Sequence, residues 1–541
     1  MMIISSRQFQ WLLKVIDGYK LKMIVYFLLE VSSILLSLLF IYYSKRTIDI
    51  SMGATEGDLN ISLSIVICCA ISGVLLRSVS QWMNQRTQVS LLSNLQSQVL
   101  KSQMLSTWRT IKKWDTGNLL VRLNSDCNDI VQMVSTTWIS LVVTGLKITA
   151  SFIFLYSMDK MLAWIILCIS PLFFLTKIYY KKMKALNVNV KNAESDLGSN
   201  MEENLRYRII LRSLGILPYR LNLFLKRQSI LKNLRFRYLN FTGFSQLIMR
   251  ICMITGYLLA FSWGVHSLKT KEITFGTMTA FLQLVNQIQS PIMSLGAFFP
   301  AFVKFRVSLN RVQEIDDSPK DNLEEAVVFD SVQSIKLRNV SFQYDSDVVI
   351  ANLNEEFRKG EAVVVLGESG KGKTTLIRLL LGVISPDKGE IIIEGNNNNY
   401  QLTSSHIENF SYVPQGNTLL RGTVRENITL GIVSVDEEKL KEVIYYSCSE
   451  FIYDLPNGLE TTIGDSGIGL SEGQAQRIGI ARALLRNKNV WIFDEATSAL
   501  DAETTNKMLN RIKDLISDKI VIFVTHNPNV DLFFDKRLLI N

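Results

Sequence analysis

Proline, cysteine and histidine are scarce in this sequence, with nine, six and three copies in 541 residues. So few prolines, together with 48% hydrophobic and only 20% charged residues, exclude a disordered or collagen-like chain. The cysteines show no CxxC or paired spacing, which excludes a disulfide scaffold and favours small buried side chains. The shortage of charge predicts that part of the chain faces lipid.

Charge is unevenly divided along the chain. Residues 1–320 hold 36 Lys/Arg against 17 Asp/Glu, whereas residues 321–541 hold 22 against 32. A basic half can bind nucleic acid, but here the positive charges lie between long apolar runs, as in the cytoplasmic loops of membrane proteins. We therefore expect the lipid bilayer as a partner and no nucleic acid.

Six apolar segments are long enough to cross a bilayer core of about 30 Å, which needs roughly 20 residues per helix. The two long connections, 84–136 and 181–243, are polar and rich in Lys and Arg, so we expect both in the cytoplasm. This topology predicts a multi-pass protein of the plasma (cell inner) membrane, with an interfacial amphipathic helix within residues 1–20. The predicted spans are 23–43, 61–83, 137–158, 161–180, 244–268 and 274–302.

Both connections keep helical patterns, so the spanning helices should continue as long cytoplasmic extensions. Residues 114–126 and 215–219 interrupt these patterns with turn residues. Each stretch is either an ordinary hairpin tip or a docking element for a cytoplasmic domain.

From about residue 335, short β-branched runs alternate with helical stretches, which predicts an α/β domain with a parallel sheet. Within it, Gly367-Glu-Ser-Gly-Lys-Gly-Lys-Thr-Thr375 follows the strand 362–366 and opens a helix, which is the P-loop pattern in its required context. Its glycines let backbone N–H groups turn toward phosphate oxygens at a helix N-terminus. Lys373 would reach the β and γ phosphates, and the Thr374 hydroxyl can ligate Mg²⁺.

A second apolar strand, 490–494, ends in the two carboxylates Asp494 and Glu495. The alternative is a solvated strand terminus, but buried strands seldom end in two acids without a chemical reason. Asp494 suits Mg²⁺ through water, and Glu495 is placed to orient or deprotonate an attacking water. These motifs predict a transmembrane domain over 1–306, a linker over 307–334 and a nucleotide-binding domain over 335–541, with cytoplasmic nucleotide binding.

Between these motifs, Leu470-Ser-Glu-Gly-Gln474 runs into a helix over 475–485. The P-loop, this signature, Asp494-Glu495, Ser498-Ala-Leu-Asp501 and His526 stand in the order and spacing of the ATP-binding cassette (ABC) transporters. The chain resembles this family over nearly its whole length, and six spans ahead of the cassette resemble its exporter-type half-transporters. The resemblance implies an α-helical transmembrane domain of six spans, with long cytoplasmic extensions, fused to an α/β P-loop cassette.

The resemblance also implies ATP and Mg²⁺ as ligands and assigns roles to single residues. Glu495, His526 and Gln415 would form the catalytic set, with His526 sensing the γ phosphate and Gln415 coupling the cassette to the membrane helices. Tyr344 would stack on adenine, whereas its alternative is a strand aromatic packed in the core. The implied Mg²⁺ ligands are Thr374, Gln415 and Asp494.

Ser471 and Gly473 would hold the γ phosphate of ATP bound to the opposite subunit, and Asp501 would link the two sites. Glu472 stands where many members have glycine, which leaves the serine and the second glycine intact. The implied nucleotide-binding residues are Tyr344, Gly367, Glu368, Ser369, Gly370, Lys371, Gly372, Lys373, Thr374, Thr375, Ser471, Gly473, Gln474, Asp494 and Asp501.

The leading hypothesis for function is an ATP-hydrolysing exporter that moves an amphiphilic, peptide or lipid-type cargo. Because this one chain supplies every element of a competent site, we expect a homodimer. One alternative is a lipid or lipid-linked-glycan flippase. Another is an ATP-gated regulatory or channel-forming member, which the intact Glu495 and His526 disfavour.

Polar residues inside the sixth apolar run are candidates for cargo contact, and charged residues in other runs are candidates for pairing. Gln283, Asn286, Gln287 and Ser290 share one face of the sixth span, and they predict either a wet cavity or hydrogen bonds between helices. Glu30, Lys147 and Arg250 place charges inside the first, third and fifth spans, where charges usually pair or face protein or water.

Overall fold

The computed structural model describes residues 5–114, 116–169, 176–321, 326–344, 347–368, 370–464, 469–525 and 534–540. The chain forms two compact units. Met1–Gln98 and Leu120–Gln313 make up the first, and Val99–Leu119 and Glu314–Asn541 make up the second. A short stretch from the first half of the sequence therefore belongs to the same unit as the C-terminal half.

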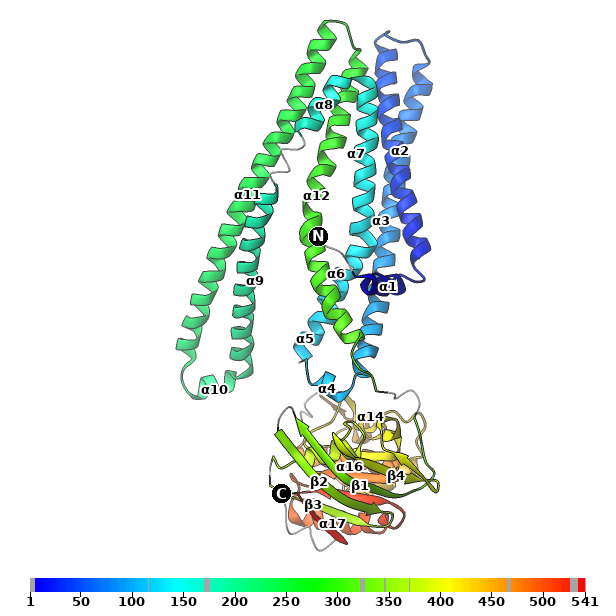
Figure 1. Ribbon diagram of the computed structural model, residues 1–541, viewed down its shortest axis with the longest axis vertical. Helices are drawn as coiled ribbons and strands as arrows, with labels where there is room; N and C mark the ends of the chain where they lie inside the picture. Colours follow the sequence, from blue (N-terminus) through cyan, green and yellow to red (C-terminus); the bar gives the residue numbers. More distant parts are fainter. Residues whose placement is uncertain are drawn as a thin grey trace. The chain divides into compact units, whose positions relative to one another are not determined.

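The first unit is built from long helices (Figure 1). Helices suit these apolar runs because they satisfy every backbone N–H and C=O within the segment, which lipid requires. The helices that precede the C-terminal half are α1 (Ser6–Val15), α2 (Lys20–Ser51), α3 (Leu59–Met104), α4 (Trp108–Ile111), α5 (Thr116–Val121), α6 (Cys127–Gln132), α7 (Trp138–Met158), α8 (Lys160–Ile169), α9 (Thr176–Arg206), α10 (Arg208–Ser213), α11 (Leu217–Lys269) and α12 (Phe275–Asp316).

Among the described residues, four helical stretches are long and apolar enough to cross a membrane: α2, α3, Thr116–Met158 and α11. The predicted fourth span, 161–180, includes residues 170–175, which lie outside the described residues. The predicted sixth span falls within α12. The predicted interfacial helix is α1, which begins with Ser5 accepting a hydrogen bond from the Gln8 backbone N–H.

Buried polar contacts fix how the membrane helices pack. The Asp49 carboxylate on α2 accepts the backbone N–H of Gly276 on α12 at 3.0 Å. A Cβ at Gly276 would lie 2.3 Å from the Lys45 carbonyl oxygen, so only glycine permits this approach. Trp263 Nε1 on α11 donates to Asp159 Oδ2, between α7 and α8, at 2.9 Å. The apolar core beside them is formed by Ile41, Leu155, Leu162, Ala163, Ile166, Ala260, Ala280, Phe281, Leu284, Val285 and Ile288.

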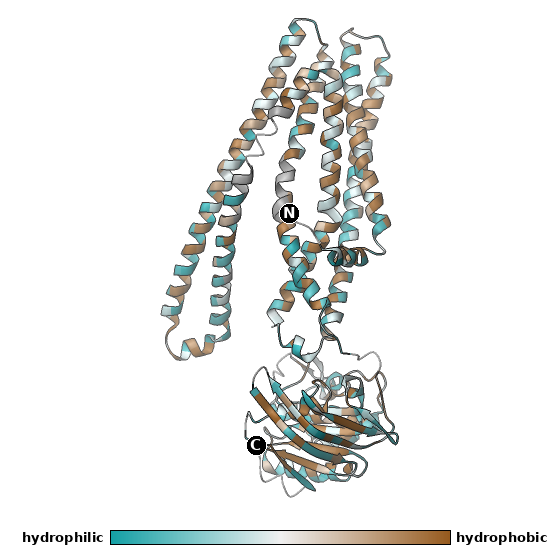
Figure 2. Cartoon of the chain, viewed as in Figure 1, coloured by the Kyte–Doolittle hydropathy of each residue, from teal (hydrophilic) through white to brown (hydrophobic). Residues whose placement is uncertain are grey.

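Helix α9 and the first part of α11 form a hydrophilic pair. Figure 2 shows hydrophilic residues along α9, whereas hydrophobic residues dominate α2. Ion pairs join the two helices, with Arg235 2.8 Å from Glu194 and Arg220 2.7 Å from Glu203. These contacts fit the expected extension of spanning helices into water. Gly215, with φ +67°, turns the chain between α10 and α11.

The second unit contains two main sheets with different strand directions. An antiparallel sheet has the order β2-β1-β4-β5, and a parallel sheet has the order β11-β3-β10-β9-β6. The strands of these sheets are β1 (Val332–Tyr344), β2 (Asp347–Arg358), β3 (Ala362–Leu366), β4 (Lys388–Gly395), β5 (Asn398–Gln401), β6 (Phe410–Val413), β9 (Val490–Asp494), β10 (Ile520–Val524) and β11 (Lys536–Leu539). Two short strands, β7 (Gly422–Thr423) and β8 (Thr462–Ile463), pair separately.

The parallel strands β3, β9 and β10 are almost wholly buried, as their continuous β-branched and aromatic sequences predict. Helices of this unit are α13 (Lys373–Leu380), α14 (Val424–Thr429), α15 (Glu437–Tyr446), α16 (Glu472–Arg486) and α17 (Ala502–Lys513). Because parallel strands end at the same edge of a sheet, the loops after β3, β6 and β9 lie together.

Val99–Leu119 joins the second unit through backbone hydrogen bonds. Thr107 N donates to the Pro319 carbonyl at 3.0 Å, and Asp321 N donates to the Leu105 carbonyl at 2.7 Å. Ser102 Oγ also donates to the Ile315 carbonyl at 3.4 Å. The helix α4 is therefore held beside the start of the cassette by main-chain contacts.

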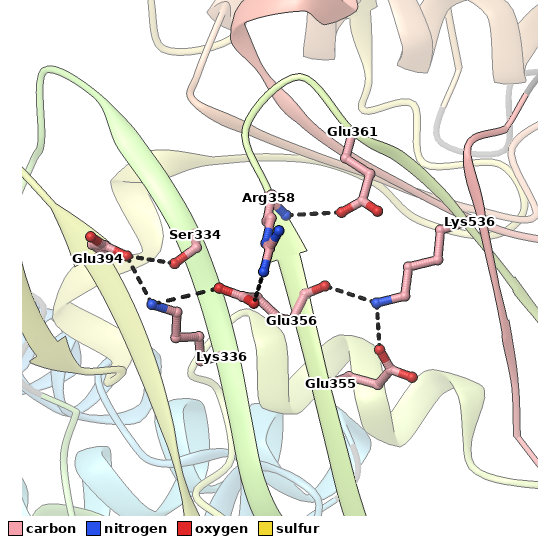
Figure 3. Close-up of polar contacts among 8 residues, drawn as sticks. All are labelled: Ser334, Lys336, Glu355, Glu356, Arg358, Glu361, Glu394 and Lys536. Atoms are coloured by element: carbon pink, nitrogen blue, oxygen red, sulfur yellow. Dashed lines mark hydrogen bonds and ion pairs between the residues drawn. The ribbon is translucent and has the colours of Figure 1, made fainter.

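A polar network links the two sheets of the cassette (Figure 3). Lys336 on β1 lies 3.1 Å from Glu394 on β4 and 3.5 Å from Glu356 on β2. Lys536, at the start of β11, lies 2.6 Å from Glu355 on β2 and also donates to the Glu356 carbonyl. The antiparallel sheet is thus tied to the end strand of the parallel sheet.

Candidate active site

The loop between β3 and α13 forms a turn that opens a helix. Gly370 and Gly372 have φ +84° and +104°, a conformation that favours glycine. Lys373 Nζ donates to the carbonyl oxygens of Gly367 at 2.6 Å and Glu368 at 3.3 Å. The sequence therefore folds locally as a P-loop, with its lysine turned into the loop.

The electrostatics around Lys373 show which groups share this space. Burial lowers the pKa of the Lys373 ammonium, while the charges of Glu495 and Asp494 oppose that shift. In the first turn of α13, Thr374 is exposed and Thr375 is buried, and Lys371 is exposed on the loop. Ser369, also predicted to bind nucleotide, lies outside the described residues.

The two acids at the end of β9 have different surroundings. Asp494 is buried and accepts a hydrogen bond from Tyr412 Oη at 3.2 Å. Burial raises the pKa of Asp494, although the hydrogen bond from Tyr412 acts in the opposite direction. Glu495 is only half-buried, and its backbone takes φ +49°, a left-handed conformation that is costly for a side chain with a Cβ. Glu495 therefore lies in a strained turn directly after the buried strand.

Glu495 meets the residue that follows β6. Gln415 Nε2 donates to Glu495 Oε2 at 2.5 Å. The backbone N–H of Glu495 is held by the Val524 carbonyl of β10 at 2.8 Å, so the turn is anchored to its neighbouring strand. Two members of the predicted catalytic set therefore touch. The third, His526, lies outside the described residues.

Tyr344, at the end of β1, is half-buried against the cassette core. Its ring meets Phe342 edge-on at 4.9 Å, and its hydroxyl accepts a hydrogen bond from Arg378 at 3.0 Å. Two residues of the segment 107–112, called the α4 segment because it contains α4, approach the same cluster. Lys112 Nζ lies 5.2 Å from the Tyr344 ring centroid, and the Arg378 guanidinium lies 4.5 Å from the Trp108 ring centroid. Tyr344 is thus partly packed in the core, and its stacking on adenine stays a prediction.

The signature residues form the start of α16. Ser471 is exposed and caps the helix by accepting the Gln474 backbone N–H at 3.2 Å, while Gln474 Oε1 accepts the Ser471 N–H at 2.9 Å. A Cβ at Gly473 would lie 2.6 Å from the Ala499 carbonyl oxygen. The glycine thus lets α16 pack closely on the loop that ends at Asp501.

Asp501 begins α17 in the same manner. Its carboxylate accepts the backbone N–H and the hydroxyl of Thr504, both at 2.8 Å. These hydrogen bonds hold the pKa of Asp501 below its usual range. The carboxylate is exposed, so its role in the folded chain includes capping the helix as well as the predicted link between sites.

Comparison with known proteins assigns both units. Residues 350–498 match the ABC transporter family, and residues 23–292 match the ABC transporter transmembrane region. The chain belongs to the ABC transporter family. The predicted fold class, a helical transmembrane domain fused to an α/β cassette, is confirmed.

Several ABC proteins resemble this chain. It is 33% identical over 285 residues to the leukotoxin export ATP-binding protein LtxB of Aggregatibacter actinomycetemcomitans and to the alpha-hemolysin translocation ATP-binding protein HlyB of Escherichia coli O157:H7. Each match covers 52% of this chain and 40% of the relative, so the chain spans less than half the length of the curated relatives it matches. A solved structure of a bacterial Atm1-family ABC exporter with ATP bound has a TM-score of 0.82, at 20% identity, over 97% of this chain and 94% of that chain. This likeness shows the fold.

The residues predicted to hold Mg²⁺ in this ABC transporter offer the oxygen donors that the ion prefers. Thr374 supplies a hydroxyl at the start of α13, Gln415 an amide and Asp494 a carboxylate. The pKa values of Lys373 and Asp494 both respond to the charge of Glu495, which shows that these groups share one electrostatic environment. The donor set and its setting fit a Mg²⁺ ion.

The predicted cargo residues of the transporter have unlike surroundings. Gln287 Oε1 accepts a hydrogen bond from Ser151 on α7 at 3.1 Å. Ser290 lines a cavity together with Glu30 and Lys147. Gln283 is half-buried and Asn286 is exposed. The amide face thus contains one contact between helices and one cavity position, and its contact with cargo stays a prediction.

Several residues of the transporter that lie at these sites were not predicted from the sequence. Arg77 lines the same cavity as Glu30. The sequence pattern that could have indicated this is a cation inside the apolar run of the second span. Trp108, Arg109 and Lys112 lie just before the stretch 114–126 that was considered for docking. Aromatic and basic residues clustered in a short interruption of a helix were the available signal.

Proposed function

We propose that this ABC transporter is an ATP-hydrolysing exporter that works as a homodimer. The observation that carries the proposal is the contact of Gln415 with Glu495 at 2.5 Å, at the edge of the parallel sheet where the P-loop also begins. An acid held beside an amide and a buried carboxylate can position a water for attack on a phosphate.

Each residue of the site has a distinct part in this chemistry. Lys373 would exchange its loop carbonyls for phosphate oxygens, which are better partners for an ammonium because they are charged. Glu495 would orient the attacking water and accept its proton. Thr374, Gln415 and Asp494 would hold Mg²⁺, which neutralises charge on the phosphates.

The homodimer is supported by the exposed signature. Ser471 and the N-terminus of α16 face outward from this chain's own fold, and a helix N-terminus favours negative charge. A second copy could therefore place its bound ATP against this end while its own signature faces the first P-loop. His526 would report the γ phosphate, as the family resemblance implies.

The membrane setting follows from the helical unit. We place the chain in the plasma (cell inner) membrane with its cassette in the cytoplasm, because the basic connections 84–136 and 181–243 favour the inner side. The names of LtxB and HlyB describe the export of a leukotoxin and the translocation of alpha-hemolysin by those proteins. For this chain we propose export of an amphiphilic, peptide or lipid-type cargo.

Replacement of Glu495 by Gln tests the proposal. We expect ATP binding to stay near that of the parent protein, while steady-state phosphate release and ATP-driven transport into inverted vesicles fall about 100-fold or more. Glu503→Gln, an exposed change in the first turn of α17, is the matched control. Turnover by Glu495→Gln within a few-fold of the parent would contradict the assigned role. A parent protein that hydrolyses ATP and moves no cargo would favour gating.

A further inference from the structure

A charged cavity lies between the membrane helices of the first unit. It has a volume of about 360 Å³, within the size range of small-ligand sites. Its wall includes Glu30 on α2, Arg77 on α3 and Lys147 on α7. Hydroxyl groups from α2, α7 and α12 also line the cavity: Ser33, Ser37, Ser140, Thr144 and Ser290.

The charges in this cavity do not balance. Glu30 accepts a hydrogen bond from Ser80 Oγ at 2.7 Å, so part of its charge is already satisfied. Among the described residues, neither Arg77 nor Lys147 forms an ion pair or a hydrogen bond, and Glu30 does not pair directly with Lys147. Two cations and one acid leave one positive charge in excess. Charges within membrane spans are costly unless they contact water or an opposite charge. An anion bound in this cavity would therefore be stabilised by the excess positive charge.

A second cavity adjoins the first and differs in chemistry. Its volume is about 460 Å³, and it shares the wall residues Ser33, Ser37, Arg77 and Gln81 with the charged cavity. The rest of its wall consists mainly of small and apolar side chains: Leu36, Phe40, Cys69, Ala70, Gly73 and Val74. A ligand could therefore place a charged group at Arg77 and Lys147 and an apolar part beside α3.

We propose that these two cavities bind an amphiphilic anion, with a carboxylate or phosphate group at Arg77 and Lys147 and an apolar chain in the neighbouring cavity. This names the class of cargo and rests on the proposed export function. The negative charge of Glu30 offsets part of the positive charge of Arg77 and Lys147. The site should therefore bind one anionic group in preference to a more highly charged ligand.

The test measures binding without ATP, on the full-length protein in discs of neutral phosphatidylcholine. Dodecyl phosphate and dodecanoate are the anionic probes, and dodecyltrimethylammonium and dodecanol are the cationic and neutral probes. All are used below micelle-forming concentrations, with empty discs to subtract partition into lipid. The two anions distinguish a phosphate from a carboxylate group.

We expect Arg77→Gln and Lys147→Gln each to weaken binding of the preferred anion about 10-fold or more, and to leave dodecanol unchanged. Glu30→Gln should tighten anion binding several-fold, because Glu30 is the one acid among the described residues of the cavity wall. Lys147→Arg keeps the charge and should retain binding, which separates charge from folding. Arg250→Gln, an exposed cation on α11 that lines neither cavity, is the matched control.

Two results would overturn the proposal. One is equal binding of the cationic and anionic probes, and the other is unchanged anion binding in both Arg77→Gln and Lys147→Gln. Failure of the export proposal gives a different pattern. In that case anion binding depends on Arg77 and Lys147, but ATP drives no movement of the bound anion across the membrane.

Discussion

Lys112 Nζ lies 5.2 Å from the centroid of the Tyr344 ring, so the segment after α3 touches the side chain implied to stack on adenine. Arg378 joins the same two elements, because it donates to Tyr344 Oη and stands over the Trp108 ring. Any movement of the α4 segment must therefore change the contacts of Tyr344. Tyr344 and the chain leading to the membrane helices therefore share one set of cation–aromatic contacts.

Substitution of Tyr344 tests the platform. Tyr344→Ala should weaken ATP binding about 5- to 150-fold, because stacking on an aromatic ring contributes roughly 1–3 kcal/mol per base. Tyr344→Phe keeps the ring and loses only the hydroxyl bonded by Arg378, so its affinity should stay within about threefold of the parent. Equilibrium binding of ATP decides this. Equal losses in the two variants would mean that the hydroxyl, rather than the ring, supports the nucleotide.

Removal of Gln415 should separate binding from turnover. Gln415→Ala deletes the partner of Glu495, so we expect steady-state phosphate release to fall about 10-fold or more. ATP affinity should change less than threefold, because the P-loop contacts remain. Gln415→Glu places a second acid beside Glu495 and should lower turnover as well. An ATP affinity that falls as much as turnover would assign Gln415 to binding instead.

Gly473 should tolerate no side chain. A Cβ there would lie 2.6 Å from the Ala499 carbonyl oxygen, so Gly473→Ala must push α16 away from the loop that ends at Asp501. Overpacking of this kind costs about 1–3 kcal/mol. We expect a lower Tm and a loss of ATPase activity, both measured on the full-length protein. Glu472→Ala, at the exposed neighbouring position, should show neither effect.

Sequence motifs predicted the P-loop, the acids after β9 and the signature because their chemistry depends on neighbours in the chain. The strand–loop–helix order alone places Lys373 and Asp494 at one edge of a parallel sheet. Contacts between distant segments were beyond this reasoning. The hydrogen bond from Ser151 to Gln287 spans 136 positions, and a helical pattern shows which residues share a face but not what that face meets.

The same limit explains the missed Arg77. A single cation inside an apolar run has many structural explanations, and only the packing of α2, α3 and α7 shows that it shares a cavity with Glu30 and Lys147. Likewise, only the folded structure shows that Lys112 of the α4 segment lies beside the Tyr344 ring. Local patterns thus predicted the strand–loop–helix order of the cassette, whereas the membrane cavity depends on how distant helices pack.

The network in Figure 3 should make the cassette sensitive to acid. A hydrogen bond from Ser334, and then one from Lys336, lowers the pKa of Glu394, and Arg358 lowers the pKa of Glu356. Because the folded pKa values lie below the ordinary value of 4.5, these groups stabilise the fold above that pH. Their contribution is lost as the pH falls through the folded pKa values.

Lys336→Met should lower the Tm at pH 7 by no more than about 4 °C, since surface ion pairs contribute little. The difference from the parent protein should shrink below pH 4, where the carboxylates of both proteins become protonated. Arg338→Met, which removes an exposed pair with Glu390, is the control and should have a smaller effect. A difference in Tm that grows on acidification would contradict this account.

The face of α12 that carries Gln287 and Ser290 should divide into a structural and a ligand-contacting part. Ser151 is fully buried, and its hydroxyl donates to Gln287 Oε1 at 3.1 Å. Hydrogen bonds between membrane helices contribute about 0.6 to 2 kcal/mol. Gln287→Leu should therefore lower thermal stability in lipid discs while ligand stimulation of the ATPase persists. Ser290 lines the charged cavity, so Ser290→Leu should alter that stimulation with little change in stability.

The double variant of Gln287→Leu with Ser151→Ala should lose no more stability than Gln287→Leu alone, because each change removes the same bond. Additive losses in this cycle, or a loss of ligand response from Gln287→Leu at unchanged stability, would show that Gln287 contacts the ligand rather than joining α7 to α12.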